Sequence, residues 1–169
     1  IFAIFQMTYL GAPMVYYGDE VGMWGATDPC CRKPMIWEDL KYADEVYLPD
    51  GSRRLKPDRV GVNYELFNHY KKLIAIRNAH KSLQLGDFNT LFMDDKNEVY
   101  GFSRKYGDEY IVVILNNSKK EKRAKITVEL PGNFTDLLND GSGAVVKGDK
   151  ILSISVKPQW GRILVMESK

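Results

Sequence analysis

The sequence has little of several features that mark common protein classes. Only two cysteines occur among its 169 residues, at the adjacent positions 30 and 31, so no disulfide framework or four-ligand zinc site can be built from them. Its net charge is +2, from 24 Lys and Arg against 22 Asp and Glu, which creates no strong field for nucleic acid or a membrane surface. The apolar run at residues 1–10 falls short of the roughly 20 residues that cross a bilayer. We therefore expect neither nucleic acid nor membrane as a partner.

Positive charge is also missing from the first 31 residues, which contain no Lys or Arg. The chain opens on Ile1 inside an apolar run, without the basic segment that precedes the core of a signal peptide. An uncharged beginning of this kind is typical of the inside of a larger domain. We expect the chain to be a fragment, and its compartment stays open between cytoplasmic and periplasmic or secreted.

What is present is a globular composition, with 44% hydrophobic, 27% charged and 12% aromatic residues. Residues 1–10 predict the end of a buried helix, with Gly11 as its C-cap and Pro13 preventing continuation. Residues 13–17 form a short apolar run, which predicts a strand buried on both faces in a parallel sheet. Together they predict half of an α/β unit.

A long segment rich in Gly and Pro follows at residues 18–62, and we expect it to be an irregular, functional loop. Asn63 is a helix-capping residue type, and it precedes an amphipathic helix expected at residues 64–80. The apolar positions of that helix fall on one stripe, Leu66, Phe67, Tyr70, Leu73 and Ile74.

From Gly86 onward the apolar period changes to two, which predicts an antiparallel β-sandwich. We expect one domain over residues 1–81 and a second over 82–169. The basic run at 118–123 is interpreted as a solvated turn between strands. Seven strands are expected, at 88–93, 99–105, 109–116, 124–130, 144–147, 151–156 and 162–167.

The residues that suit chemistry best lie in the loop after the expected strand 13–17. Asp28 and Arg32 are four residues apart in a turn that contains Pro29. A carboxylate and a guanidinium at this spacing can pair with each other, and together they can accept and donate hydrogen bonds to sugar hydroxyls. The spacing alone favours a surface ion pair that holds the loop.

Other candidates carry weaker signals. Asp19 and Glu20 are adjacent carboxylates, but neighbours on an extended segment point in opposite directions, which favours structural hydrogen bonding over a catalytic pair. The adjacent cysteines have no further ligand at metal spacing, so structural or free thiols are favoured, and no metal site is expected. Packing roles are expected for the remaining candidates, His69, His80, Trp37 and Trp160, whereas Trp24 is the better candidate for stacking on a sugar.

Several motifs in this order resemble the alpha-amylase family of glycoside hydrolases, family 13. Residues 11–20 read GAPMVYYGDE and resemble the eighth strand of the family's barrel. Residues 27–37 read TDPCCRKPMIW and resemble the following loop in the neopullulanase, cyclomaltodextrinase and maltogenic amylase group. Residues 66–77 resemble the last barrel helix, and the chain from Ser82 resembles the C-terminal β-sandwich of the family.

This resemblance implies the end of a (β/α)8 TIM barrel, its last helix, strand and helix, followed by the sandwich. The family cleaves α-1,4-glucosidic bonds with retention, through an Asp nucleophile and a Glu acid/base that belong to earlier strands. The resemblance therefore implies no catalytic residue here, and the chain alone is expected to be inactive. It assigns binding of glucose units on the non-reducing side to Asp28 and Arg32, and structural support to Glu20.

The resemblance also sets the partners. They are an α-glucan substrate, namely maltooligosaccharides, cyclodextrins, pullulan or starch, and the rest of the barrel; a homodimer stays open. No cofactor is implied, with calcium left open for an upstream segment. Cys30 stands where relatives commonly carry Gly or Asp, and residues 41–62 look like an insertion near the active-site face or beside the last helix, which leaves the exact specificity open. The alternative function is a noncatalytic sandwich for carbohydrate binding or dimerisation, although such a module should begin near residue 82.

Overall fold

The computed structural model describes residues 1–25, 28, 30–48 and 50–167. The chain divides into two compact units, one made of residues 1–13 with 72–169 and the other of residues 14–71. Helix α2 (Tyr64–Ala79) contributes residues to both units.

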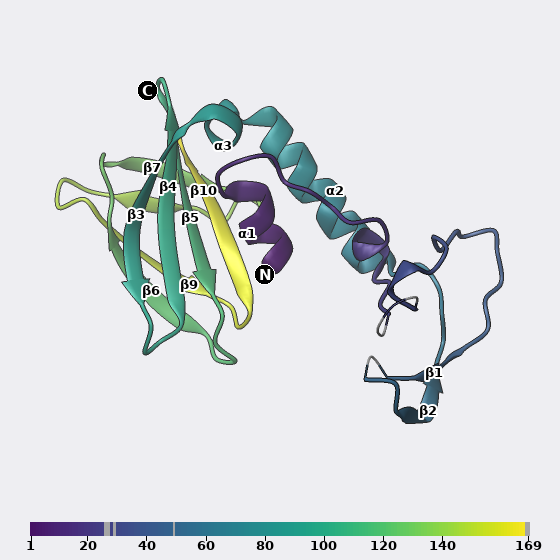
Figure 1. Cartoon of the computed structure of the whole chain (residues 1–169). Coiled ribbons are helices and arrows are strands. Elements are labelled where there is room, and N and C mark those ends of the chain that lie inside the picture. The colour runs from purple at the N-terminus through teal and green to yellow at the C-terminus, as the bar shows by residue number, and fades with distance from the viewer. Residues whose placement is uncertain (26–27, 29, 49, 168–169) are drawn as a thin grey trace. The chain divides into compact units, whose positions relative to one another are not determined.

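The first unit is built on an antiparallel β-sandwich, as the sequence predicts (Figure 1). A six-stranded sheet has the order β3-β4-β5-β10-β7-β8, and β6 pairs with β9 in a second sheet. Apolar side chains between the two sheets form the core, among them Val112, Ile114, Ile126, Leu152 and Leu164. The strands are β3 (Asp87–Asp94), β4 (Val99–Tyr106), β5 (Glu109–Asn116), β6 (Lys122–Thr127), β7 (Gly132–Asp136), β8 (Ala144–Val146), β9 (Ile151–Val156) and β10 (Trp160–Met166).

Each of the seven expected strands has a counterpart, but strand β7 was not expected. Its sequence GNFTD contains a glycine and three polar residues, so it shows no apolar alternation. Asp136 is nevertheless fully buried, because its carboxylate accepts hydrogen bonds from the backbone N–H of Leu138 at 2.9 Å and from Arg162 Nη1 at 3.1 Å. Because these partners satisfy the buried carboxylate, a polar segment that the sequence pattern assigns to a loop forms a strand.

Helix α1 (Phe2–Thr8) packs against the six-stranded sheet (Figure 1), and its Ile4 and Met7 are buried. The ring of Phe5 meets Phe102 of β4 at a centroid distance of 6.5 Å. The expected helix is therefore confirmed, but only one face of it is buried and Phe2 is 85% exposed, and the expected C-cap at Gly11 is wrong. The helix ends at Thr8 with Tyr9 as its C-cap in an extended conformation, because buried arginine side chains bind the carbonyl groups there.

The expectation of a buried strand at residues 13–17 is wrong for this structure. The segment is extended, but no strand of the described chain pairs with it, and Met14 is 73% exposed. Tyr16 and Tyr17 are also exposed, and their rings pack on each other at a centroid distance of 4.8 Å. A strand buried on two faces needs neighbouring strands and covering helices, and these residues have neither.

The segment expected to be irregular, residues 18–62, contains regular structure in its second half. Strands β1 (Glu45–Tyr47) and β2 (Arg53–Asp58) form an antiparallel hairpin. Short 3₁₀ turns, η1 (Asp19–Val21) and η2 (Cys30–Arg32), precede it.

The helix expected at residues 64–80 is confirmed as α2. Asn63 caps it, since its Oδ1 accepts the backbone N–H of Leu66 at 3.0 Å. Of the expected apolar stripe Leu73 is buried, whereas Ile74 is 39% exposed. The short helix α3 (Lys81–Leu85) follows and leads into β3.

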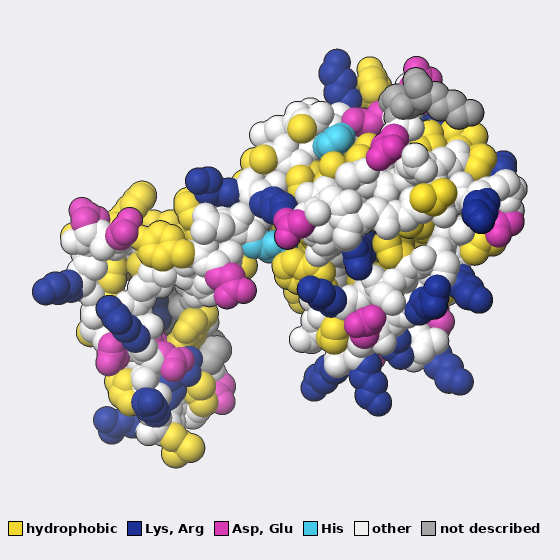
Figure 2. Space-filling model, turned by 180° about the vertical axis from the view of Figure 1, so that it is seen from behind, with side chains coloured by type: hydrophobic (Ala, Val, Ile, Leu, Met, Phe, Trp, Pro, Cys, Tyr) yellow, Lys and Arg dark blue, Asp and Glu magenta, His cyan; other side chains and the backbone are white. Residues whose placement is uncertain are grey.

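The basic run is a turn only in part: residues 117–121 join β5 to β6, with Lys119 and Lys120 exposed, whereas Lys122 and Arg123 begin β6. Lys96 lies beside these lysines. Lys and Arg side chains gather at the lower end of the sandwich in Figure 2. Within the described residues, no helix is long and apolar enough to span a membrane.

Candidate functional site

Two left-handed glycines, Gly18 and Gly22, flank the 3₁₀ turn η1 that opens the candidate site. Gly18 has φ +95°, and a Cβ there would lie 2.6 Å from the sulfur of Met23, so the turn requires glycine. The Glu20 carboxylate accepts the backbone N–H of Gly18 at 2.9 Å, and the Met23 N–H donates to the Gly18 carbonyl at 2.8 Å. Glu20 therefore has the structural hydrogen-bonding role that the sequence favours, and Asp19 beside it is exposed.

The candidate substrate-binding residues Asp28 and Arg32 lie together at η2. Arg32 Nη2 donates to Asp28 Oδ1 in an ion pair. The side chains are 65% and 63% exposed, so solvent screens the pair and it adds little stability. The second carboxylate oxygen and the remaining guanidinium N–H groups are available to a ligand with hydroxyl groups.

Lys33, the residue after Arg32, is held by contacts of both its backbone and its side chain. The Lys33 carbonyl accepts the phenol O–H of Tyr17 at 2.9 Å, and its ammonium group pairs with Glu45 of β1. This hydrogen bond from Lys33 lowers the pKa of the Glu45 carboxyl, so Glu45 stays ionised at neutral pH. Lys33 thereby joins the loop that carries the Asp28–Arg32 pair to the hairpin.

Trp24, the expected stacking residue, is covered by cations. Lys33 Nζ lies 4.8 Å from the indole centroid, and the guanidinium carbon of Arg54 lies 4.5 Å from it. Arg54 is itself held by an ion pair with Asp58 and by a hydrogen bond to the Tyr47 carbonyl at 3.1 Å. The indole thus serves to fix one cation of the loop, Lys33, and one of the hairpin, Arg54, through cation–π attraction.

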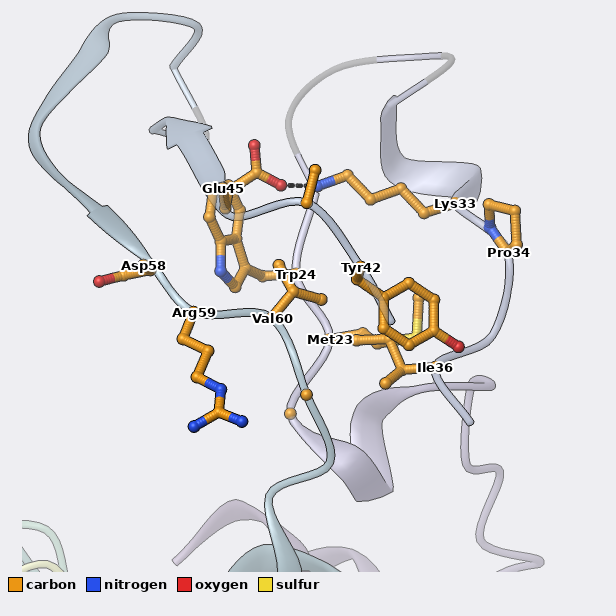
Figure 3. Close-up of a pocket in the computed structure, with 13 residues that line it drawn as sticks. Met23, Trp24, Lys33, Pro34, Ile36, Tyr42, Glu45, Asp58, Arg59 and Val60 are labelled. Carbon is orange, nitrogen blue, oxygen red and sulfur yellow. Dashed lines mark hydrogen bonds and ion pairs between the residues drawn. The ribbon is translucent and has the colours of Figure 1, made fainter. Parts of the chain in front are cut away.

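A pocket of about 280 Å³ lies between the hairpin and the loop (Figure 3). Its wall is mostly apolar, with the Trp24 indole beside Met23, Ile36, Tyr42 and Val60. The Tyr42 hydroxyl is fixed, because it accepts the backbone N–H of Trp37 at 2.6 Å.

Charged groups complete the lining of this pocket, Lys33 and Arg59 with Glu45 and Asp58. Sequence reasoning missed the pocket because its lining comes from segments up to 39 residues apart, Gly22 to Gly61. One signal could have found the hairpin beside it. Asp50 and Gly51 form an Asp-Gly turn signal, and in the structure Gly51 has φ +83° while Asp50 Oδ1 accepts the Ser52 N–H at 2.9 Å.

The other candidates are not among the residues that line this pocket. Trp37 is 59% exposed, and Trp160 belongs to the sandwich, where its indole N–H donates to Asn139 Oδ1 at 2.8 Å. His69 lies on α2, and His80, expected on the same helix, lies just after it, with Nδ1 2.7 Å from Glu109 Oε1.

The cysteines and metal ligands complete the set of candidates. Cys31 is an exposed free thiol, and the side chain of Cys30 lies outside the described part of the structure. Among the described residues, no three His, Cys, Asp or Glu side chains converge as ligands of a metal ion.

Comparison with known proteins places this geometry in a family. Residues 1–86 match the family described as "Alpha amylase, catalytic domain", and residues 90–165 match "Alpha amylase, C-terminal all-beta domain". The chain belongs to the alpha-amylase family. Its fold class is thereby confirmed as the end of the catalytic domain followed by the all-β domain.

Relatives within the alpha-amylase family extend well beyond this chain. Neopullulanase 2 from Thermoactinomyces vulgaris is 36% identical over 162 residues, which are 95% of this chain and 24% of that protein. Cyclomaltodextrinase from Thermoanaerobacter pseudethanolicus is 41% identical over 119 residues, 70% of this chain and 17% of that protein. The chain thus spans about a quarter or less of the length of these curated relatives.

Solved structures of the alpha-amylase family agree with this placement. The Anoxybacillus alpha-amylase matches with a TM-score of 0.74 at 25% identity, covering 98% of this chain and 31% of that one. A cyclomaltodextrinase matches with a TM-score of 0.75 at 25% identity, covering 98% of this chain and 25% of that one.

Proposed function

We propose that this chain is the C-terminal part of an α-glucan-acting glycoside hydrolase, and that Asp28 and Arg32 hold glucose units of its substrate. The observation that carries the proposal is the exposed ion pair between these side chains in a chain of the alpha-amylase family. The pair offers a hydrogen-bond acceptor and several donors side by side. Glucose presents neighbouring hydroxyls that donate and accept, so the pair suits two hydroxyls of one sugar.

The reaction of the whole enzyme is retaining hydrolysis of α-1,4-glucosidic bonds in maltooligosaccharides, cyclodextrins, pullulan or starch. The nucleophile and the acid/base belong to the upstream part of the barrel, so this chain supplies binding without bond cleavage. Relatives named neopullulanase and cyclomaltodextrinase support this range of substrates.

The rest of the barrel is the proposed protein partner. Phe2 is 85% exposed and Met14 is 73% exposed, and each belongs to a segment that matches the catalytic domain. Large apolar side chains exposed to this degree suit burial against further strands and helices. Association of this chain with a separately produced upstream part would restore such burial.

The experiment that tests the proposal is titration of the full chain with maltotriose, followed by NMR. Arg32→Ala removes charged hydrogen bonds of about 1.5–3 kcal/mol, so the dissociation constant should rise about tenfold or more. Arg53→Ala, an exposed arginine on β2, is the matched control and should leave binding unchanged. An unchanged dissociation constant for Arg32→Ala would remove the pair from the binding site.

A further inference from the structure

The pocket beside the hairpin lies close in the chain to the Asp28–Arg32 pair. Lys33 lines the pocket and follows Arg32 in the chain, so their Cα atoms lie about 3.8 Å apart. Trp24, on the opposite arm of the same loop, precedes Asp28 by four residues. A glucan chain bound by the pair therefore has this pocket within reach of its neighbouring units.

The lining of the pocket combines an apolar wall with a polar rim. Tyr42, Met23 and Ile36 present a ring and aliphatic groups to the interior (Figure 3). Lys33 and Glu45 stand at the rim as a donor and an acceptor. A pyranose ring has the matching surfaces, since its faces carry C–H groups and its edge carries hydroxyls.

The charge of the lining favours a neutral ligand. Lys33 is paired with Glu45, and Asp58 is paired with Arg54, which leaves the guanidinium of Arg59 as the excess charge. A lining with nearly equal positive and negative charge neither attracts a polyanion nor suits a free cation. A neutral, polyhydroxylated ligand fits it best.

The volume of the pocket limits how many sugar units it can bind. Its volume of about 280 Å³ lies just below the roughly 300–1,000 Å³ typical of ligand pockets, so it suits a single sugar ring. Tyr42 is the aromatic residue that we expect to stack on the sugar, because cations lie over the Trp24 indole and the Tyr42 hydroxyl is held by the Trp37 N–H. Trp24 is then a positioning residue.

We propose that this pocket is an accessory glucose-binding subsite, which binds one further unit of the α-glucan held by Asp28 and Arg32 and makes affinity depend on chain length. The inference rests on the proposed function. It assigns the hairpin β1–β2 a binding role, through Tyr42 on the segment that leads into it and through Glu45 of β1.

The test is a length series of maltose, maltotriose and maltotetraose titrated into the full chain, with the Trp24 indole N–H signal followed by NMR. The longer sugars should bind about threefold to tenfold more tightly than maltose, and they alone should shift that signal. Tyr42→Ala should abolish the gain with length and leave maltose binding unchanged. Ala43→Phe fills the pocket from an exposed position of its lining, and it should abolish the same gain without removing a contact.

The matched control is Lys41→Ala, an exposed neighbour outside the pocket lining, which should keep the gain with length. One outcome would overturn the subsite and keep the proposed function. In it, Arg32→Ala loses binding of all three sugars, while Tyr42→Ala and Ala43→Phe keep the increase of affinity with chain length. Unchanged binding of all three sugars in Arg32→Ala would overturn the proposed function itself.

Discussion

Arg77 and Arg104 both donate a hydrogen bond to the carbonyl oxygen of Tyr9, at 3.4 and 3.0 Å. Both side chains are buried, and burial lowers the pKa of each guanidinium. The last carbonyls of a helix lack partners and carry partial negative charge, which two cations offset. The further acceptors are the carbonyls of Met7 and Gly11 for Arg77, and of Thr8, Leu83 and Gly86 for Arg104.

Replacing Arg104 by Met should therefore destabilise the sandwich unit strongly. Arg104 is 1% exposed, and its loss leaves the buried carbonyls of Thr8, Leu83 and Gly86 without this donor. We expect Arg104→Met to lower the free energy of unfolding by about 3 kcal/mol, as judged from urea denaturation. Arg123→Met, on the exposed face of β6, should change it by less than about 0.5 kcal/mol. Equal stability of the two variants would contradict a structural role for the Arg104 guanidinium.

Gly86 should tolerate no side chain. A Cβ at this position would lie 2.4 Å from the Ser82 carbonyl oxygen and 2.7 Å from that of Lys105, and both are backbone atoms. We expect Gly86→Ala to cost about 3 kcal/mol of unfolding free energy, seen as a lower midpoint in thermal denaturation. Gly148→Ala is the control, since a Cβ there meets nothing within 4 Å. A Gly86→Ala protein that melts with the control would show that the backbone there relaxes freely.

Removal of the cap of α2 should weaken that helix. The Asn63 side chain accepts the N–H of Leu66, and its backbone N–H donates to the Val21 carbonyl at 3.1 Å. Asn63→Ala keeps the backbone bond and loses the side-chain one, which should cost about 1 kcal/mol. Asn63→Asp should retain most of the stability, and hydrogen exchange of the first turn of α2 is the measurement. Equal exchange in both variants would argue against capping by this side chain.

Stability should also fall in acid through Glu109. Burial alone raises the pKa of its carboxyl, but hydrogen bonds from Ser82 and His80 outweigh this and hold the pKa below the ordinary 4.5. The unfolded chain then binds more protons than the folded chain, so the contribution is present above pH 4.5 and is lost as the pH falls through the folded pKa.

Unfolding free energies from about pH 6 to about pH 3 test this prediction. Glu109→Gln should lose stability at the upper end and converge on the parent chain at the lower end. Glu121→Gln, in the exposed turn before β6, should keep the pH dependence of the parent. A constant difference between Glu109→Gln and the parent across the range would contradict the assignment.

The sandwich could be predicted from the sequence because its signals are local. A continuous apolar run marks β5, and alternating apolar residues mark β6 and β9, without knowledge of the rest of the fold. Strand β7 was not predicted, because the burial of Asp136 depends on partners such as Arg162, which is 26 residues away. The prediction for residues 13–17 was wrong because their apolar side chains suggest burial, whereas the described chain has no elements that bury them.

The candidate site was likewise predictable only where its residues are close in the sequence. Spacing brings Asp28 and Arg32 together in the structure, and their role in binding glucose stays a prediction. The pocket could not be foreseen, since Lys33 meets Glu45 only after the hairpin has formed. Pairing at a distance of twelve residues leaves no periodic trace in the sequence.

Strand β10 has a consequence for synthesis. It is the last strand of the described residues, yet it lies between β5 and β7 and pairs with both, Leu164 facing Val112 on one side and Asp136 on the other. A ribosome makes the chain from its N-terminus, so β5 and β7 emerge with the edges that β10 will cover still unpaired. The six-stranded sheet closes only after residues 160–166 have left the exit tunnel. A stop codon before residue 160 would thus split the sheet at its centre instead of trimming its edge.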